Sequence, residues 1–91
     1  MMYEIHYTHQ FKKAYKLCKR RGCNMILLEQ AIRLLADTGE LPQIYKPHKL
    51  SGKYSQIWEC HIEPDWLLLW SIENKEMTLL LLNTGTHSDI F

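Results

Sequence analysis

The chain has 91 residues, enough for one compact domain and too few for two cores of ordinary size. Hydrophobic residues make up 46% of the sequence and charged residues 23%, which excludes the highly charged, weakly hydrophobic composition of disordered chains. The formal net charge is only +1, so total charge does not by itself indicate a polyanionic partner. We therefore expect a single domain over residues 1–91.

Targeting and redox signals indicate a cytoplasmic chain that does not associate with a membrane. No apolar run is long enough to cross a bilayer, and residues 1–7 carry Glu4 and His6 where a signal peptide would be apolar. The sequence holds three cysteines, Cys18, Cys23 and Cys60. This odd set has no CxxC spacing, so we expect reduced and mostly buried thiols rather than a disulfide framework or a cysteine zinc site.

A strand and a basic helix are predicted first. Residues 3–7 alternate aromatic or apolar residues with polar ones, which is typical of a half-buried strand. Thr8 is a good N-cap for a helix over residues 9–21, and Gly22 ends it. One face of this helix is apolar, through Phe11, Tyr15 and Cys18. The opposite face carries six basic residues, Lys12, Lys13, Lys16, Lys19, Arg20 and Arg21.

A second helix and a charged loop follow. Asn24 caps a segment in helical register that runs to about Asp37, and Gly39 ends it. The two helices are predicted to form a helical hairpin. Residues 41–54 contain two prolines and a glycine and expose a trio of lysines, Lys46, Lys49 and Lys53.

The second half of the chain predicts an antiparallel meander. Three runs typical of strands, 57–63, 66–72 and 77–83, are separated by Pro64-Asp65 and Asn74-Lys75, which suit the centres of tight turns. The order is β-α-α-β-β-β. The fold class is therefore α+β, with the helical hairpin packed on one face of the sheet.

This arrangement brings ionisable groups together. With these turns, His61 is predicted to lie opposite Leu68, and Asp65 opposite Thr84. The segment after Thr84 therefore meets the first turn at one end of the sheet, where we expect His61, Asp65 and His87 to converge.

Such residues suit ribonuclease chemistry. Cleaving RNA without a metal needs a base for the 2′-hydroxyl, an acid for the departing 5′-oxygen and positive charge on the phosphate. Histidine serves as base or acid because its ordinary pKa is about 6.5. The loop lysines could hold phosphates, and Trp66 or Phe91 could stack on an unpaired base. From these residues alone, a small α+β domain that binds RNA is the most that the sequence supports.

The distribution of charge also favours a polyanion. Residues 1–53 hold ten Lys or Arg against four acidic residues, and residues 54–91 hold one Lys against six acidic residues. A positive surface can gather nucleic acid through counterion release even when the whole chain is nearly neutral. A merely solvated helix face is the alternative.

Three motifs carry a specific resemblance. Residues 46–52 read K-P-H-K-L-S-G, residues 61–68 read H-I-E-P-D-W-L-L, and residues 84–87 read T-G-T-H. Together, and in this order, they resemble the YafQ-type branch of the RelE/ParE toxins. The similarity spans the whole chain and is densest in residues 45–91.

The resemblance implies a function and its residues. It implies a metal-independent and cofactor-free endoribonuclease that cleaves mRNA in the ribosomal A site, with Phe91 holding the substrate. It also implies a cognate antitoxin of a DinJ/RelB-like kind that neutralises the toxin, with operator DNA contacted only through that antitoxin. The implied catalytic residues are His48, His61, Asp65 and His87. The concentrated positive charge of the first helix, rather than the resemblance, predicts the residues that bind the ribosome or the RNA backbone: Lys12, Lys13, Lys16, Lys19 and Arg20.

One departure keeps alternatives open. Asn83 stands where relatives often carry an arginine that contacts phosphate, and asparagine supplies no positive charge. A degenerate toxin homologue, acting mainly by binding its antitoxin and regulating its operator, is therefore one alternative. A ParE-like toxin that binds DNA gyrase is another, although such a toxin has no need of the histidine set.

Overall fold

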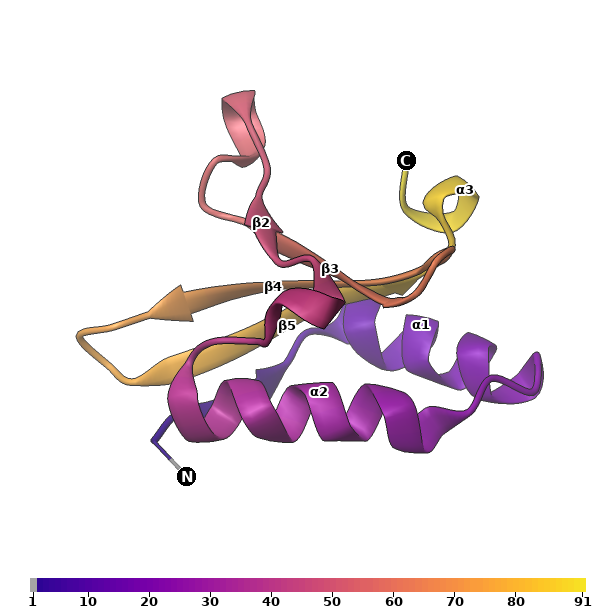
Figure 1. Cartoon of the computed structure of the whole chain (residues 1–91), viewed down its shortest axis with the longest axis horizontal. Coiled ribbons are helices and arrows are strands. Elements are labelled where there is room, and N and C mark those ends of the chain that lie inside the picture. The colour runs from indigo at the N-terminus through magenta and orange to yellow at the C-terminus, as the bar shows by residue number, and fades with distance from the viewer. Residues whose placement is uncertain (1) are drawn as a thin grey trace.

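The computed structural model describes residues 2–91, so that Met1 of the predicted domain lies outside the described residues. Two long helices cover one face of a five-stranded sheet (Figure 1). The elements, in chain order, are β1 (Glu4–Tyr7), α1 (His9–Arg20), α2 (Met25–Thr38), η1 (Gln43–Tyr45), β2 (His48–Lys49), η2 (Gly52–Tyr54), β3 (Trp58–Glu63), β4 (Trp66–Glu73), β5 (Thr78–Gly85) and α3 (His87–Ile90).

The predicted helix caps are confirmed. The Thr8 hydroxyl accepts a hydrogen bond from the backbone N–H of Phe11 and donates one to the Leu81 carbonyl of β5, at 3.1 and 2.8 Å. It thereby starts α1 and fixes it to the sheet. The Asn24 side chain caps α2 in the same way, and Gly39 ends α2 with φ at 79°. A Cβ on Gly39 would lie 2.8 Å from the Tyr3 ring, so both the conformation and the space require glycine.

The sheet contains the predicted meander and two further strands. Strands β3, β4 and β5 pair antiparallel, as expected. Strand β1 lies parallel to β5, and the two-residue β2 pairs with β3, placing His48 opposite Glu59. The order is β1-β5-β4-β3-β2, so the sheet is mixed rather than wholly antiparallel.

The predicted register is wrong at the site. An irregularity between His61 and Glu63 places His61 opposite Leu67 rather than Leu68. Between β4 and β5 the error is three residues, because Leu68 rather than Asp65 lies opposite Thr84, with a second irregularity between Leu69 and Trp70. A β-bulge shifts pairing in this way because one strand carries an extra residue. The second turn is also longer than predicted, since it occupies residues 74–77.

The core lies between the sheet and the two helices. Its largest buried side chains include Phe11 of α1, Leu28 and Leu35 of α2, and Trp70 of β4. Cys60 of β3 belongs to the same core. Side chains alternate along a strand, so Glu59 and His61, on either side of Cys60, face away from the helices. The segment around β2 and the helix α3 project from that same face (Figure 1).

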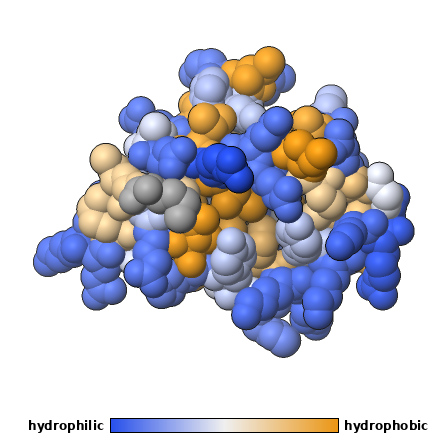
Figure 2. Space-filling view, turned by 90° about the horizontal axis from the view of Figure 1, so that it is seen from below, coloured by the Kyte–Doolittle hydropathy of each residue, from blue (hydrophilic) through white to orange (hydrophobic). Residues whose placement is uncertain are grey.

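The helical face carries exposed apolar side chains. Figure 2, which looks onto this side, shows apolar surface among hydrophilic residues. A groove of about 580 Å³ is lined by β1, α1 and α2, with Tyr7, Phe11 and Ile32 among its apolar residues and Lys12, Lys16 and Arg33 among its basic ones. None of the helices described within residues 2–91 is long and apolar enough to span a bilayer.

Candidate active site

The first group at the site joins α3 to the β3–β4 turn. Asp65 accepts two hydrogen bonds from His87, one from the backbone N–H at 3.1 Å and one from Nδ1 of the ring at 2.7 Å. The ring hydrogen bond is the main reason that the pKa of the Asp65 carboxyl lies below its ordinary value of 3.8. Because a carboxylate only accepts, Nδ1 of His87 carries the hydrogen, which leaves Nε2 available to another molecule.

His61 lies beside this pair. Its ring centroid is 6.1 Å from that of His87, and its Nδ1 lies 3.2 Å from the Pro64 carbonyl oxygen. The carbonyl accepts a hydrogen, so Nε2 of His61 is also available. The predicted proximity of His61, Asp65 and His87 is confirmed, despite the shifted register.

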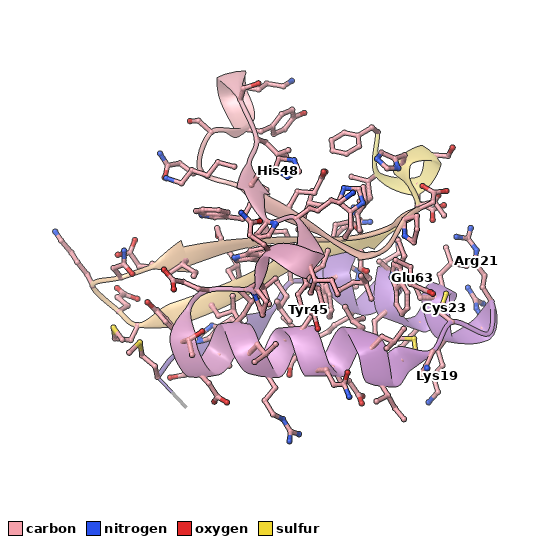
Figure 3. All side chains as sticks on the ribbon, in the orientation of Figure 1. Lys19, Arg21, Cys23, Tyr45, His48 and Glu63 are labelled. Carbon is pink, nitrogen blue, oxygen red and sulfur yellow. The ribbon has the colours of Figure 1, made fainter. Side chains whose placement is uncertain are left out.

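His48 belongs to a second group, from β2 and β3. Its Nδ1 lies 3.0 Å from the Lys46 carbonyl oxygen and its Nε2 lies 3.3 Å from the Glu59 carboxylate. Both neighbours are acceptors, so each ring nitrogen of His48 already has a partner within the protein. The Glu59 side chain is only 8% exposed, and a buried carboxylate needs such a partner. Figure 3 shows His48 on the segment that projects from the sheet.

Sequence reasoning missed the role of Glu59. This residue stands on the same face of β3 as His61 and two positions before it, so the two groups are roughly 7 Å apart along the strand. An acidic residue in the middle of a buried strand was the available signal. Its partner could not be identified because β2 is only two residues long and has no strand pattern of its own.

The two aromatic residues expected to stack on a base lie in different environments. Trp66 was expected to stack on a base, but it is only 5% exposed and lies in the core, where its indole N–H donates to the Thr84 hydroxyl at 2.9 Å. The expectation for Trp66 is therefore wrong, because no ring face is open. Phe91 follows α3 and is 66% exposed, so its ring remains open to a ligand.

The loop lysines divide between the two faces. Lys49 is next to His48 on β2, and adjacent strand residues point to opposite sides. Its ammonium accordingly lies 5.6 Å from the Trp58 ring, on the helical side, so the structure does not bring Lys49 to the site. Lys46 and Lys53 are exposed on the projecting segment, and Lys53 lies 5.1 Å from the Tyr54 ring.

Asn83 lies on the same face as the histidines. It is opposite Leu69, which alternates with the core residues Leu68 and Trp70 and so faces away from the helices. Its side-chain oxygen accepts from the Thr84 backbone N–H at 2.9 Å. Only its amide N–H groups are left to meet a phosphate, as neutral donors.

The basic face of α1 lies on the other side of the sheet from the site (Figure 1). Its exposed cations line one shallow surface, through Lys13, Lys16, Lys19 and Arg20. Lys12 is exposed beside them and borders the apolar groove. This surface can bind phosphates but cannot hold the same nucleotide as the histidines.

Two of the three thiols are deeply buried. Burial raises the pKa of the Cys18 thiol to about 11 and that of Cys60 to about 12, so both are protonated near neutral pH. Within the described part of the chain, no three His, Cys, Asp or Glu side chains converge in a way that could hold a metal ion.

Comparison with known proteins identifies the family. A family model described as the bacterial toxin of type II toxin-antitoxin systems, YafQ, matches residues 3–91. The mRNA interferase toxin YafQ of Escherichia coli K12 is 36% identical over 89 residues, which cover 97% of this chain and 95% of the relative. YafQ in the crystal structure of the E. coli DinJ–YafQ complex is 33% identical, with a TM-score of 0.88 and 98% of each chain covered. A metal-bound toxin from Helicobacter pylori is 35% identical, with a TM-score of 0.90 and both chains fully covered. The chain therefore belongs to the YafQ family of bacterial toxins from type II toxin–antitoxin systems.

Proposed function

We propose that this toxin is an endoribonuclease that cleaves mRNA in the ribosomal A site by general acid–base catalysis, without a metal ion, and so inhibits translation. The observation that carries the proposal is the Asp65–His87 pair, which leaves Nε2 of His87 without a partner in the protein and lies beside a second imidazole, that of His61, at 6.1 Å between ring centroids. The relative named an mRNA interferase supports the substrate class.

The chemistry is an internal transesterification. A base takes the proton of a 2′-hydroxyl, the resulting oxygen attacks the adjacent phosphorus, and an acid protonates the 5′-oxygen that leaves. The products are a 2′,3′-cyclic phosphate or its hydrolysed 3′-phosphate and a 5′-hydroxyl. Two imidazoles with open Nε2 atoms, His61 and His87, can supply the base and the acid.

The hydrogen bonds favour a division of roles. His87 is the side chain most directly involved in proton transfer, because Asp65 fixes its ring and stabilises the imidazolium that forms. We assign His48 to the phosphate, a contact in which its Nε2 exchanges the Glu59 carboxylate for a phosphate oxygen. Phe91 stacks on a base of the substrate.

The experiment uses purified toxin, programmed ribosomes and an excess of EDTA. We expect cleavage to continue and to leave the product ends named above, while a His87→Ala variant is inactive. His9→Ala is the matched control, because His9 is exposed at the start of α1, on the opposite side of the sheet from the site. Activity that disappears in EDTA and returns with a divalent cation would contradict the metal-free mechanism.

Asn83 favours a second candidate function. Without a cation at this position, the chain could be a degenerate toxin that serves mainly to bind its antitoxin and regulate the operator. Growth after induction without the antitoxin separates the two. Arrest that depends on His87 supports the nuclease, whereas unimpaired growth with intact antitoxin binding supports the degenerate toxin.

The cognate antitoxin is the proposed protein partner, and the E. coli DinJ–YafQ complex supports this class. We assign it the groove between β1, α1 and α2, where Lys12, Lys16 and Arg33 border apolar side chains. With three cations and one carboxylate, that of Glu29, the groove is net positive and fits an amphipathic segment with acidic residues. Arg33→Glu should weaken binding of the antitoxin encoded next to this chain, while Lys75→Glu, in the β4–β5 turn, should not. Equal binding by both variants would place the antitoxin elsewhere.

A further inference from the structure

An ion pair outside the histidine cluster connects the end of α1 to α3. Arg21, directly after α1, donates to both carboxylate oxygens of Asp89, at 2.6 and 3.2 Å. The two residues are 68 positions apart in the sequence. Figure 3 shows the Arg21 side chain extending toward α3, which carries Asp89.

The carboxylate of Asp89 also shapes α3. It accepts from the backbone N–H of Thr86 at 2.9 Å, while the Thr86 hydroxyl accepts from the backbone N–H of Asp89 at 3.1 Å, forming a capping box. Gly85 has φ at 146°, and a Cβ there would lie 2.8 Å from a carboxylate oxygen of Asp89. The absence of a side chain at Gly85 therefore leaves room for the Asp89 carboxylate, which Arg21 also binds.

This helix depends on external contacts for its position. With only four residues, α3 is too short to be stable by itself. Besides its packing on β5, two side-chain contacts hold it: His87 to Asp65 at its start, and Asp89 to Arg21 two residues later. Arg21 and Asp65 also line one hollow of about 320 Å³ under this helix, so both anchors act on the same small region.

We propose that Arg21 is a positioning residue for the cleavage reaction, holding α3 through Asp89 so that His87 and Phe91 keep their places at the substrate. This inference rests on the proposed nuclease function. Arg21 is the one basic residue on the basic face of the first helix that was not predicted to bind the ribosome, and its charge is paired within the protein. Arg20, its neighbour, has no ion pair among residues 2–91.

The test measures two quantities for each variant: the single-turnover cleavage rate at saturating ribosomes, and KM for ribosomes. Arg21→Gln should lower the single-turnover rate by about 10- to 100-fold, the effect of misplacing a reacting group, with KM within about twofold of the wild type. Arg21→Lys should restore part of the rate, because lysine keeps the charge but not the two-point geometry. Arg20→Gln should raise KM without lowering the saturated rate, and Lys75→Gln, in the β4–β5 turn, should change neither.

Two kinetic outcomes overturn the inference. Equal rates for Arg21→Gln and wild type would show that α3 needs no such anchor, and a raised KM alone would make Arg21 an ordinary docking cation. NMR relaxation of residues 86–91 provides an independent readout, since Arg21→Gln should increase their fast motion while the core amides stay unchanged. If the wild type itself cleaves nothing, the proposed function fails, and unchanged relaxation in Arg21→Gln would separately refute the anchor.

Discussion

Asp65 and His87 are expected to act as one catalytic unit, and a double-mutant comparison tests this. His87→Ala removes the group that transfers a proton, which is worth about 10²- to 10⁴-fold in rate. Asp65→Asn keeps the size of the side chain and one acceptor oxygen but removes the charge from the 2.7 Å contact with Nδ1. A charge-assisted hydrogen bond is roughly twice as strong as a neutral one, and Asp65→Asn weakens this bond without removing it. The rate loss in Asp65→Asn should therefore be smaller than the loss in His87→Ala.

The solvent exposure of Asp65 and His87 determines how large the rate loss in Asp65→Asn should be. The side chains of His87 and Asp65 are 56% and 68% exposed, so water screens the charge that Asp65 supplies. We therefore expect Asp65→Asn to slow cleavage about tenfold, well short of the loss caused by His87→Ala. Asp37→Asn, at an exposed position of α2, is the matched control and should cleave like wild type.

The assay is single-turnover cleavage of a defined mRNA on ribosomes, with thermal unfolding and antitoxin binding measured on every variant. Because Asp65 acts through His87, adding Asp65→Asn to His87→Ala should cost nothing further. Stability and antitoxin binding should stay near those of the wild type. Rate losses that multiply in the double variant would show independent roles, and full activity of His87→Ala would remove His87 from the mechanism.

Three further predictions test the surroundings of the site. The first neutralises three cations along α1, Lys12, Lys16 and Lys19, each changed to Gln. Ribosome binding should weaken and the slope of log K against log salt should flatten by about 0.7 to 0.9 for each lost phosphate contact, so an unchanged slope would place the docking surface elsewhere. Second, the Arg21 guanidinium holds the pKa of Asp89 at about 2, against 3.8, so the pair stabilises the fold above about pH 4 and is lost as pH falls toward 2. A carboxylate NMR titration should find this pKa raised toward 3.8 in Arg21→Gln, and an unmoved value would refute the assignment. Third, Gly39→Ala should lower the free energy of unfolding by at least about 1 to 2 kcal/mol, measured in urea, because it forces alanine into the left-handed region against the Tyr3 ring.

The helices and the meander could be predicted because their signals are local. Thr8 and Asn24 precede periodic apolar runs, and the Pro64-Asp65 turn fixes which strands become neighbours. The place of β1 could not be predicted, since period-two alternation marks a strand but does not name its partner. The bulge at His61 and Glu63 likewise has no sequence marker, so the register was wrong even though the cluster was right.

The contacts that reach across the fold account for the remaining differences. A buried tryptophan and an exposed stacking one look alike in the sequence, and only the fold shows that Trp66 is buried, with its indole N–H bonded to Thr84. The contacts of His48 with Glu59 and of Arg21 with Asp89 each connect different elements. A single sequence contains no record of such pairs.

These contacts also explain how the acidic second half of the chain is compatible with binding RNA. Six acidic residues there, against one lysine, would be expected to repel RNA. Three of the six, Glu59, Asp65 and Asp89, are instead each paired with a basic side chain, two of them with histidines of the proposed catalytic set. A carboxylate paired in this way stabilises a nearby positive charge more than it repels a distant phosphate, because opposite charges interact most strongly at contact and are screened by salt beyond about 10 Å. The acidic residues thus support the histidines and α3, while Lys46 and Lys53 are exposed on the projecting segment, where their charges can meet the substrate backbone.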